Sequence, residues 1–303
     1  MKNNIAKTGD ISHIEIPEKK TSYEKHFLAL LNITSEVEPI MEVATALARV
    51  YKGRITAQNF VILPPQTPLS VGLRFAEGPS KNLRIASQYH SENLAADFHL
   101  LLSHDRRLSI LYTTREKNID FVIGGFQGCM DIYGNLRNAL SKLPTDTLIL
   151  RPFSNKRISD YSRILVPLMK GIHTPLAVDV ARDLAESFGK KLAILHEFEP
   201  QNSEQPWRQT LNRLETKHGS MSMERITTGQ NSMISRILKE LKEDTWLVLP
   251  AYRPSWWTRF RPGIKQRGLL KEIIRCSDAP LLIVKKHERR TGFFQKILKR
   301  EWH

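Results

Sequence analysis

The chain repeats itself, and this feature constrains its fold more than any other. The segment His26–Thr34 (HFLALLNIT) matches Arg163–Gly171 (RILVPLMKG) at a constant offset of 137 residues. A second match pairs Ile119–Phe126 (IDFVIGGF) with Thr245–Tyr252 (TWLVLPAY) at an offset of 126 residues. The matched blocks keep their order along the chain. We therefore infer two homologous halves, with a deletion in the middle of the second.

Each half alternates apolar segments of strand length with amphipathic helical segments. In the first half FLALL predicts a buried strand, and Ser35 with Glu38 forms the S-x-x-E capping-box pattern that begins a helix. Apolar residues then recur at helical spacing as far as Tyr51, and Gly53 is placed to end the helix. The first half further predicts strands at 55–62, 98–103, 121–125 and 147–151, and helices at 79–92, 106–117 and 135–142.

The second half follows the same order. ILVPL predicts its first strand, Thr174 caps the next helix with Pro175 at the first helical position, and Gly189 ends that helix. LAILHEF, ERITTG, TWLVLP and PLLIVK predict the remaining strands. Apolar strands alternating with amphipathic helices are typical of α/β proteins, in which a doubly wound parallel sheet has helices on both faces. Such sheets bind ligands at the carboxyl ends of their strands.

Length and composition fit two soluble domains. The 303 residues suffice for two domains of about 150 residues each. No apolar run approaches the ~20 residues of a membrane-spanning helix, and the first residues lack the apolar core of a secretory signal. Cys129 and Cys276 provide neither a disulfide framework nor a zinc set. We therefore expect a protein of the reducing cytoplasm.

Basic residues are concentrated at one end of the chain. The net charge is +15, and residues 251–303 hold 14 Lys or Arg against 4 Asp or Glu. Within this region the loop 252–267 mixes tryptophan and phenylalanine with Arg and Lys, and the tail 287–303 places aromatic and aliphatic residues on one helical stripe. Such segments suit an anionic membrane surface. The alternative is that the apolar stripe of the tail packs onto the second half.

The two halves resemble universal stress protein domains, which have an adenine-nucleotide alpha-hydrolase-like (Rossmann-like) fold. The marks are an ILVPL-type first strand leading into a helix, a fourth strand running into a glycine loop, and a last strand of the SDAPLLIVK type. The resemblance implies a tandem two-domain protein of stress response. The predicted organisation is a tail at 1–23, a first domain at 24–153, a linker at 154–160, a second domain at 161–286 and a basic amphipathic tail at 287–303.

The resemblance also implies certain partners. Members of the family occur as dimers, as tandem chains and as regulatory domains attached to membrane transporters, and Pro64–Gly78 is similar to a stretch of the transporter-attached members. We expect the halves to pair as a dimer within one chain about a pseudo-twofold axis, and a homodimer of whole chains is a further expectation.

Nucleotide-binding members of the family carry Gly-x2-Gly-x9-Gly-Ser/Thr after the fourth strand, where backbone N–H groups and a helix N-terminus hold the phosphates. Here Gly125 and Gly128 fit the opening pair, and Gly134 with Asn135 takes the closing position after a shortened loop. The adenine-contacting Asp of the family corresponds to Asn32. The resemblance thus implies at most weak ATP binding in the first half. The alternative for the glycines is a tight strand-to-helix turn that needs a positive φ.

The second half has lost this pattern. Met169 stands where the family has its Asp, and Ala251-Tyr252-Arg253-Pro254 replaces the Gly-x2-Gly. A proline has no N–H to donate to a phosphate. We therefore expect no ATP at this half.

No residue pattern specifies a reaction. The histidines and cysteines show no metal-ligand spacing, and no nucleophile elbow or Walker loop occurs. His104-Asp105 lies at a strand end, but the second half has Gly229-Gln230 there, which favours a loop histidine over a catalytic one. We predict no enzyme and no metal. Three classes of function remain, in this order: a stress-response sensor or adaptor, a cytosolic regulatory module at a transporter or anionic membrane, and a nucleic-acid binder.

Overall fold

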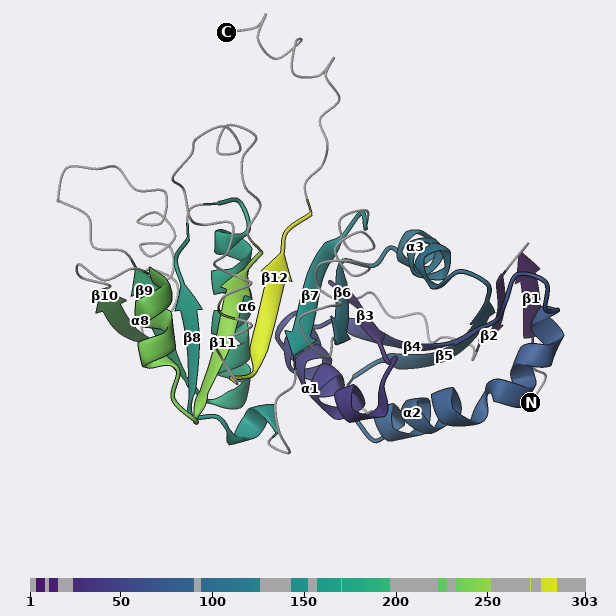
Figure 1. Cartoon of the computed structure of the whole chain (residues 1–303), viewed down its shortest axis with the longest axis horizontal. Coiled ribbons are helices and arrows are strands. Elements are labelled where there is room, and N and C mark those ends of the chain that lie inside the picture. The colour runs from purple at the N-terminus through teal and green to yellow at the C-terminus, as the bar shows by residue number, and fades with distance from the viewer. Residues whose placement is uncertain are drawn as a thin grey trace, which may run out of the picture.

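The computed structural model describes residues 4–8, 11–15, 24–89, 94–125, 143–151, 157–169, 171–196, 223–227, 233–251, 273 and 279–287. In this part of the chain, strands form one sheet in the order β1-β2-β5-β4-β3-β6-β7-β12-β11-β8-β9-β10 (Figure 1). The strands are β1 Asn4–Thr8, β2 Ile11–Glu15, β3 His26–Leu30, β4 Arg54–Ile62, β5 Ala96–Ser103, β6 Phe121–Gly125, β7 Asp146–Arg151, β8 Arg163–Pro167, β9 Lys191–His196, β10 Met223–Thr227, β11 Thr245–Pro250 and β12 Leu281–Lys285. The helices are α1 Thr34–Val50, α2 Glu77–Ser87, α3 Arg106–Glu116, α6 Thr174–Phe188 and α8 Met233–Glu240, with short 3-10 helices η1 Leu69–Phe75 and η3 Ile158–Asp160.

The predicted α/β class with a mostly parallel sheet is confirmed. In the first half β3 lies in the middle, with β4 and β5 on one side and β6 and β7 on the other. In the second half β8 lies in the middle, with β9 and β10 on one side and β11 and β12 on the other. All of these neighbours are parallel within a half. The halves join through β7 and β12, which are antiparallel (Figure 1). The carboxyl ends of the strands therefore lie at opposite edges of the sheet in the two halves.

The N-terminal segment extends the sheet of the first half. Residues 1–23 were expected to form a tail, but β2 pairs antiparallel with β5, and β1 pairs antiparallel with β2. The repeat could not predict these strands, because no corresponding segment precedes the second half.

Successive residues of each central strand enter two separate cores, one on each face of the sheet. In β3, Phe27 and Ala29 pack in the core that contains buried side chains of α1 and α6. Leu28 and Leu30 pack in the core on the other face, which contains Ile110 of α3. Helices therefore cover both faces, as the alternating pattern of apolar strands and amphipathic helices predicted.

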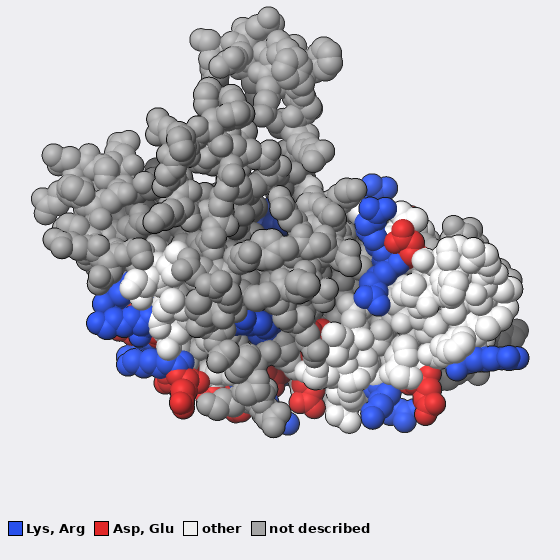
Figure 2. Space-filling view, in the orientation of Figure 1, with Lys and Arg blue, Asp and Glu red and all other residues white. Residues whose placement is uncertain are grey.

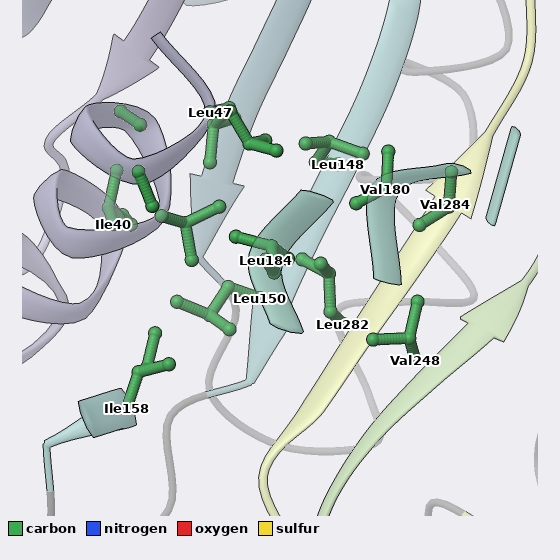
Figure 3. Close-up of a cluster of buried hydrophobic side chains, with 14 of the residues drawn as sticks. Ile40, Leu47, Leu148, Leu150, Ile158, Val180, Leu184, Val248, Leu282 and Val284 are labelled. Atoms are coloured by element: carbon green, nitrogen blue, oxygen red, sulfur yellow. The ribbon is translucent and has the colours of Figure 1, made fainter. Parts of the chain in front are cut away.

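The contact between the halves is made by corresponding elements. α1 contacts α6, and in the antiparallel pair of β7 and β12 the central residues Ile149 and Ile283 are partners. These two isoleucines hold the same position in the matching strands TLILR and LLIVK. Figure 3 shows the apolar side chains between these elements, including Ile40 and Leu47 of α1, Leu148 and Leu150 of β7, Leu184 of α6, and Leu282 and Val284 of β12. Pairing of like with like is what a pseudo-twofold axis requires.

Two predicted helix caps are wrong in detail. α1 begins at Thr34 with Ile33 as N-cap and no side-chain capping bond, so Ser35 and Glu38 do not form a capping box. Thr174 is the first residue of α6 rather than its cap, and its hydroxyl donates to the carbonyl oxygen of Met169 at 2.5 Å. The capping patterns of the sequence therefore do not identify the cap residue of either helix.

The C-terminal ends of the corresponding helices differ. Gly189 ends α6 in the left-handed conformation (φ 63°), as predicted. After α1 the left-handed residue is Lys52 (φ 46°), one position before the predicted Gly53. A side chain with a Cβ pays a conformational cost in this region that glycine does not.

We expect the substitution Lys52→Gly to raise the free energy of unfolding by about 0.5–1 kcal/mol, because it relieves this cost at an exposed position. Urea unfolding of the two proteins measures the change. Lys117→Gly is the matched control, because Lys117 ends α3 with φ −97° and should lose stability when glycine is introduced. A loss of stability in both variants would contradict the prediction.

The link between the halves is hydrogen-bonded to α1 through the half-buried Glu42. The Glu42 carboxylate accepts a hydrogen bond from the backbone N–H of Ile158 at 2.8 Å. Burial raises the pKa of Glu42 above its ordinary value of 4.5, although this hydrogen bond and Arg157 oppose the shift. The Glu42 carboxyl group therefore stays protonated to a higher pH in the folded chain than in the unfolded chain.

Stability should consequently fall as the pH rises through 4.5 and the raised pKa of Glu42, because the unfolded state ionises first. We expect Glu42→Gln to reduce this decline above pH 4.5, since an amide oxygen still accepts from Ile158 and carries no charge. Unfolding in urea at several pH values measures it. Glu42→Ala, which removes the acceptor, should lose stability at every pH. An unchanged slope in Glu42→Gln would contradict the prediction.

Candidate functional site

The first-half site lies where β3 and β6 end and α1 begins. Leu30 pairs with Gly124, so Asn32 and Gly125 leave neighbouring parallel strands at one edge of the sheet. Thr34 begins α1 two residues after Asn32. The structure thus brings two of the predicted residues to the same edge. The other three, Gly128, Gly134 and Asn135, lie outside the described residues.

An acidic side chain that was not predicted fills the space beside Gly125. Glu36, the third residue of α1, is completely buried. A Cβ atom at position 125 would lie 2.3 Å from Oε2 and 2.4 Å from Cδ of Glu36. No real Cβ approaches another atom so closely, so the residue at 125 has to be glycine while Glu36 stays where it is. Gly125 does not have the left-handed conformation, so a positive φ is not the reason for this glycine.

Glu36 could have been singled out from the sequence by its position. It precedes Ile40 by four residues and therefore stands on the same stripe as the apolar residues of α1. An acid on the buried face of a helix, next to a glycine turn, indicates a specific contact, because a buried charge has to be compensated.

The arrangement does not fit an ATP phosphate at Gly125. The N-terminus of α1 attracts an anion, and the Glu36 carboxylate already lies there against the glycine. A phosphate at this point would meet the carboxyl atoms of Glu36. Nearby, Oδ1 of Asn32 is buried and has no hydrogen-bond partner among the described residues.

The strand register corrects the second repeat match by one residue. Phe27 pairs with Phe121, and Ile164, which corresponds to Phe27, pairs with Trp246. Phe121 therefore corresponds to Trp246, and the offset of 126 residues is wrong. The wrong offset would align Phe121 with Leu247, which packs on the opposite face of the sheet. A slip of one residue always exchanges the faces of a strand.

With the correct register, Pro250 takes the place of Gly125 in the second half. Gly125 pairs with Leu150, and Pro250 pairs with Val284 at the corresponding position of β12. Met169 corresponds to Asn32, as predicted, and His173 corresponds to Glu36. The expectation that this half lacks the phosphate-binding pattern is unchanged, since the proline at this position has no N–H.

His173 makes a different contact from that of Glu36. It is buried at the N-terminus of α6, and its Nδ1 accepts from the backbone N–H of Lys286 at 3.1 Å. The two halves therefore use the corresponding position for unrelated contacts.

His104 and Asp105 have structural roles. The Asp105 carboxylate caps α3 by accepting from the backbone N–H groups of Arg107 at 2.7 Å and Leu108 at 3.2 Å. His104 Nδ1 lies 3.2 Å from the carbonyl oxygen of Leu63. These contacts account for both residues without a reaction.

Among the described residues, no group of three or more His, Cys, Asp or Glu is arranged to hold a metal ion. Within the same ranges, none of the helices has the length and apolar character needed to cross a membrane. On the face shown in Figure 2, described basic and acidic side chains lie next to one another.

The two basic segments begin at the same edge of the sheet. The loop 252–267 follows Ala251, whose N–H donates to the carbonyl oxygen of Val284 in the neighbouring strand at 2.7 Å. The tail begins at His287, whose N–H donates to the Asp146 carboxylate at 2.6 Å. The rest of the tail and the whole loop lie outside the described residues, so their predicted surfaces stay predictions.

The described part of the chain has a two-part α/β fold similar to that of universal stress proteins. No family model matches the sequence, and no curated protein matches it. Solved structures do match. A universal stress protein from Archaeoglobus fulgidus superposes with a TM-score of 0.56 at 14% identity, covering 88% of this chain and 98% of its own.

Two further structures extend the comparison. A Pseudomonas aeruginosa protein assigned to the same family has a TM-score of 0.52 and 11% identity, over 91% of this chain and 95% of its own. The cytoplasmic domain of a prokaryotic cation chloride cotransporter has a TM-score of 0.57 and 10% identity, over 89% of this chain and 98% of its own. At these identities the comparisons establish the universal stress protein fold.

Proposed function

We propose that the chain is a cytoplasmic sensor or adaptor protein of the stress response, with two universal stress protein-like domains and no reaction of its own. The observation that carries this proposal is the pairing of β7 with β12 and of α1 with α6. It supports a dimer-like unit within one chain, whose outer surfaces are left for partners. A homodimer of whole chains would use surfaces other than these paired elements.

In this proposal adenine nucleotides bind weakly at most, and only in the first half. Glu36 lies against Gly125, and Pro250 replaces the corresponding glycine in the second half. Asn32 can still donate and accept hydrogen bonds but lacks the charge of the family's Asp. We therefore treat ATP as a minor ligand and do not assign the protein a resident cofactor.

Two measurements test the proposal. Protein purified natively should release less than a stoichiometric amount of nucleotide on acid extraction. A strain without the chain should survive at least one stress less well, and the wild-type chain should restore survival. Stoichiometric nucleotide in the purified protein, or full survival under every stress tried, would overturn the proposal.

A second candidate function is a regulatory module at a transporter or an anionic membrane. The similarity to the cotransporter domain over 98% of that domain's length favours it. The start of two basic aromatic segments at one edge of the sheet also favours it. Nucleic-acid binding ranks third, because only the basic charge supports it.

This second candidate makes a prediction about vesicles. We expect the full chain to sediment with anionic but not with neutral vesicles, because each basic residue near such a surface contributes about 1 kcal/mol. Truncation after Arg290, which removes residues 291–303, should abolish sedimentation, and added salt should weaken it. If the full chain stays in the supernatant at low salt, the tail does not bind membranes.

A further inference from the structure

We propose that the Glu36 carboxylate is a built-in substitute for a ligand phosphate at Gly125, and that it keeps nucleotides out of the first half. This inference deepens the proposed function, since it rests on the weak nucleotide binding assigned there. On this inference the nucleotide site of the first half is not lost, because the Glu36 side chain closes it.

The Glu36 carboxylate lies at the N-terminal end of α1. Glu36 lies in the first turn of α1, a helix of 17 residues whose N-cap, Ile33, has no side chain that could satisfy the free N–H groups. Backbone N–H groups and the helix dipole make such an end attractive to anions. Glu36 therefore supplies the negative charge that this end of the helix favours.

The same carboxylate lies directly against Gly125. Both carboxylate oxygens would lie within 3 Å of a Cβ at position 125, at 2.3 and 2.9 Å. The side chain thus occupies the open face of the glycine, which is the face that a phosphate needs for close approach to the backbone. A carboxylate resembles a phosphate in charge and in presenting several acceptor oxygens.

The two halves differ at both positions. The half that keeps the glycine has an acid at position 36, whereas the half with Pro250 has His173 at the corresponding position. His173 contacts the backbone of Lys286 instead. The acid thus accompanies the glycine in the first half, whereas the corresponding residue of the second half, His173, is the N-cap of α6 and has a different contact.

If this inference is correct, removing the side chain should open the site to nucleoside polyphosphates. We expect Glu36→Ala to bind ATP at least about tenfold more tightly than the wild type, because a like charge and a steric block are removed together. Glu36→Gln loses only the charge and should gain less. Inorganic phosphate, titrated separately, shows how much of the gain the anion alone provides.

Two controls keep the interpretation specific. His173→Ala removes the corresponding side chain in the second half and should not gain ATP binding, since Pro250 lacks an N–H. The double variant Glu36→Ala with Gly125→Ala places a Cβ where the phosphate would lie and should lose the gained affinity. Calorimetric titration and the shift in melting temperature with ATP are the measurements.

Every outcome decides the inference. It is overturned if Glu36→Ala and Glu36→Gln fold and bind ATP no better than the wild type. It is also overturned if both variants fail to fold in the presence of ATP and phosphate, because a carboxylate that stands in for a ligand should be replaced by that ligand. These failures leave the adaptor proposal intact, whereas stoichiometric nucleotide in the wild type would overturn that proposal itself.

Discussion

Replacing Asp183 with alanine is expected to lower the free energy of unfolding by about 3–5 kcal/mol, the usual cost of breaking a buried charged pair by removing one partner. Asp183 in α6 is almost completely buried. Its carboxylate accepts a hydrogen bond from the Tyr51 hydroxyl at 2.5 Å and contacts the Arg182 guanidinium at 2.5 Å. Because Tyr51 follows α1 and Asp183 belongs to the other half, this contact ties the halves together.

The chemistry of the pair supports this size of effect. Burial, followed by the hydrogen bond to Asp183, raises the pKa of Tyr51 well above its ordinary value of 10. Tyr51 therefore remains a donor, and alanine at 183 would leave its hydroxyl without this acceptor and remove the nearer of the two acids at the Arg182 guanidinium. Equilibrium unfolding in urea measures the loss.

Three variants separate this contact from general packing. Tyr51→Phe should cost only about 1 kcal/mol, the net value of one hydrogen bond. Asp183→Asn, which still accepts, should fall between the two. Asp179→Ala is the matched control, because Asp179 lies on the same helix at 3.6 Å from Arg182 and is more exposed. If Asp183→Ala costs no more than this control, the contact does not stabilise the junction.

The second large effect is expected at Gly53. We expect Gly53→Ala to lower the free energy of unfolding by about 3 kcal/mol, the upper range for inserting atoms into a packed site. A Cβ there would lie 2.6 Å from the carbonyl oxygen of Lys25 and 2.9 Å from the ring of Phe27. The carbonyl belongs to the backbone leading into β3, so it cannot move without shifting that strand.

The control for Gly53 is a glycine with free space. A Cβ at Gly78, in the first turn of α2, would meet no atom within 4 Å. Gly78→Ala should therefore cause no loss of stability. Thermal and urea unfolding of both variants provide the comparison. Equal behaviour of the two would show that the close approach at Gly53 is not rigid.

Sequence predicted the fold because it depends on features that the repeat displays twice. Apolar strands and amphipathic helices in a fixed order suffice for the α/β class and for the expectation of similar halves. The register of β11 was missed by one residue, since an apolar run such as TWLVLP aligns almost equally well in two ways. Only the partner strand distinguishes Trp246 from Leu247 as the counterpart of Phe121.

The sequence predicted that Asn32 and Gly125 lie close together, but not which side chain lies against Gly125. Asn32 and Gly125 end neighbouring strands, and strand order alone is enough to place them at one edge. That Glu36 fills the face of Gly125 depends on side-chain direction in three dimensions. A search for the glycine motif does not identify Glu36, because this residue is not part of the motif.

The antiparallel junction of β7 and β12 gives the molecule two opposite poles. The edge with Asn32 and Gly125 belongs to one pole, and the edge where Ala251 and His287 lead into the basic segments belongs to the other. A ligand at one pole and a partner at the other do not compete for space, because the length of the strands separates them. The same arrangement lets substitutions accumulate at one pole without disturbing the other, and the glycine at position 125 and the proline at position 250 are consistent with such independent divergence.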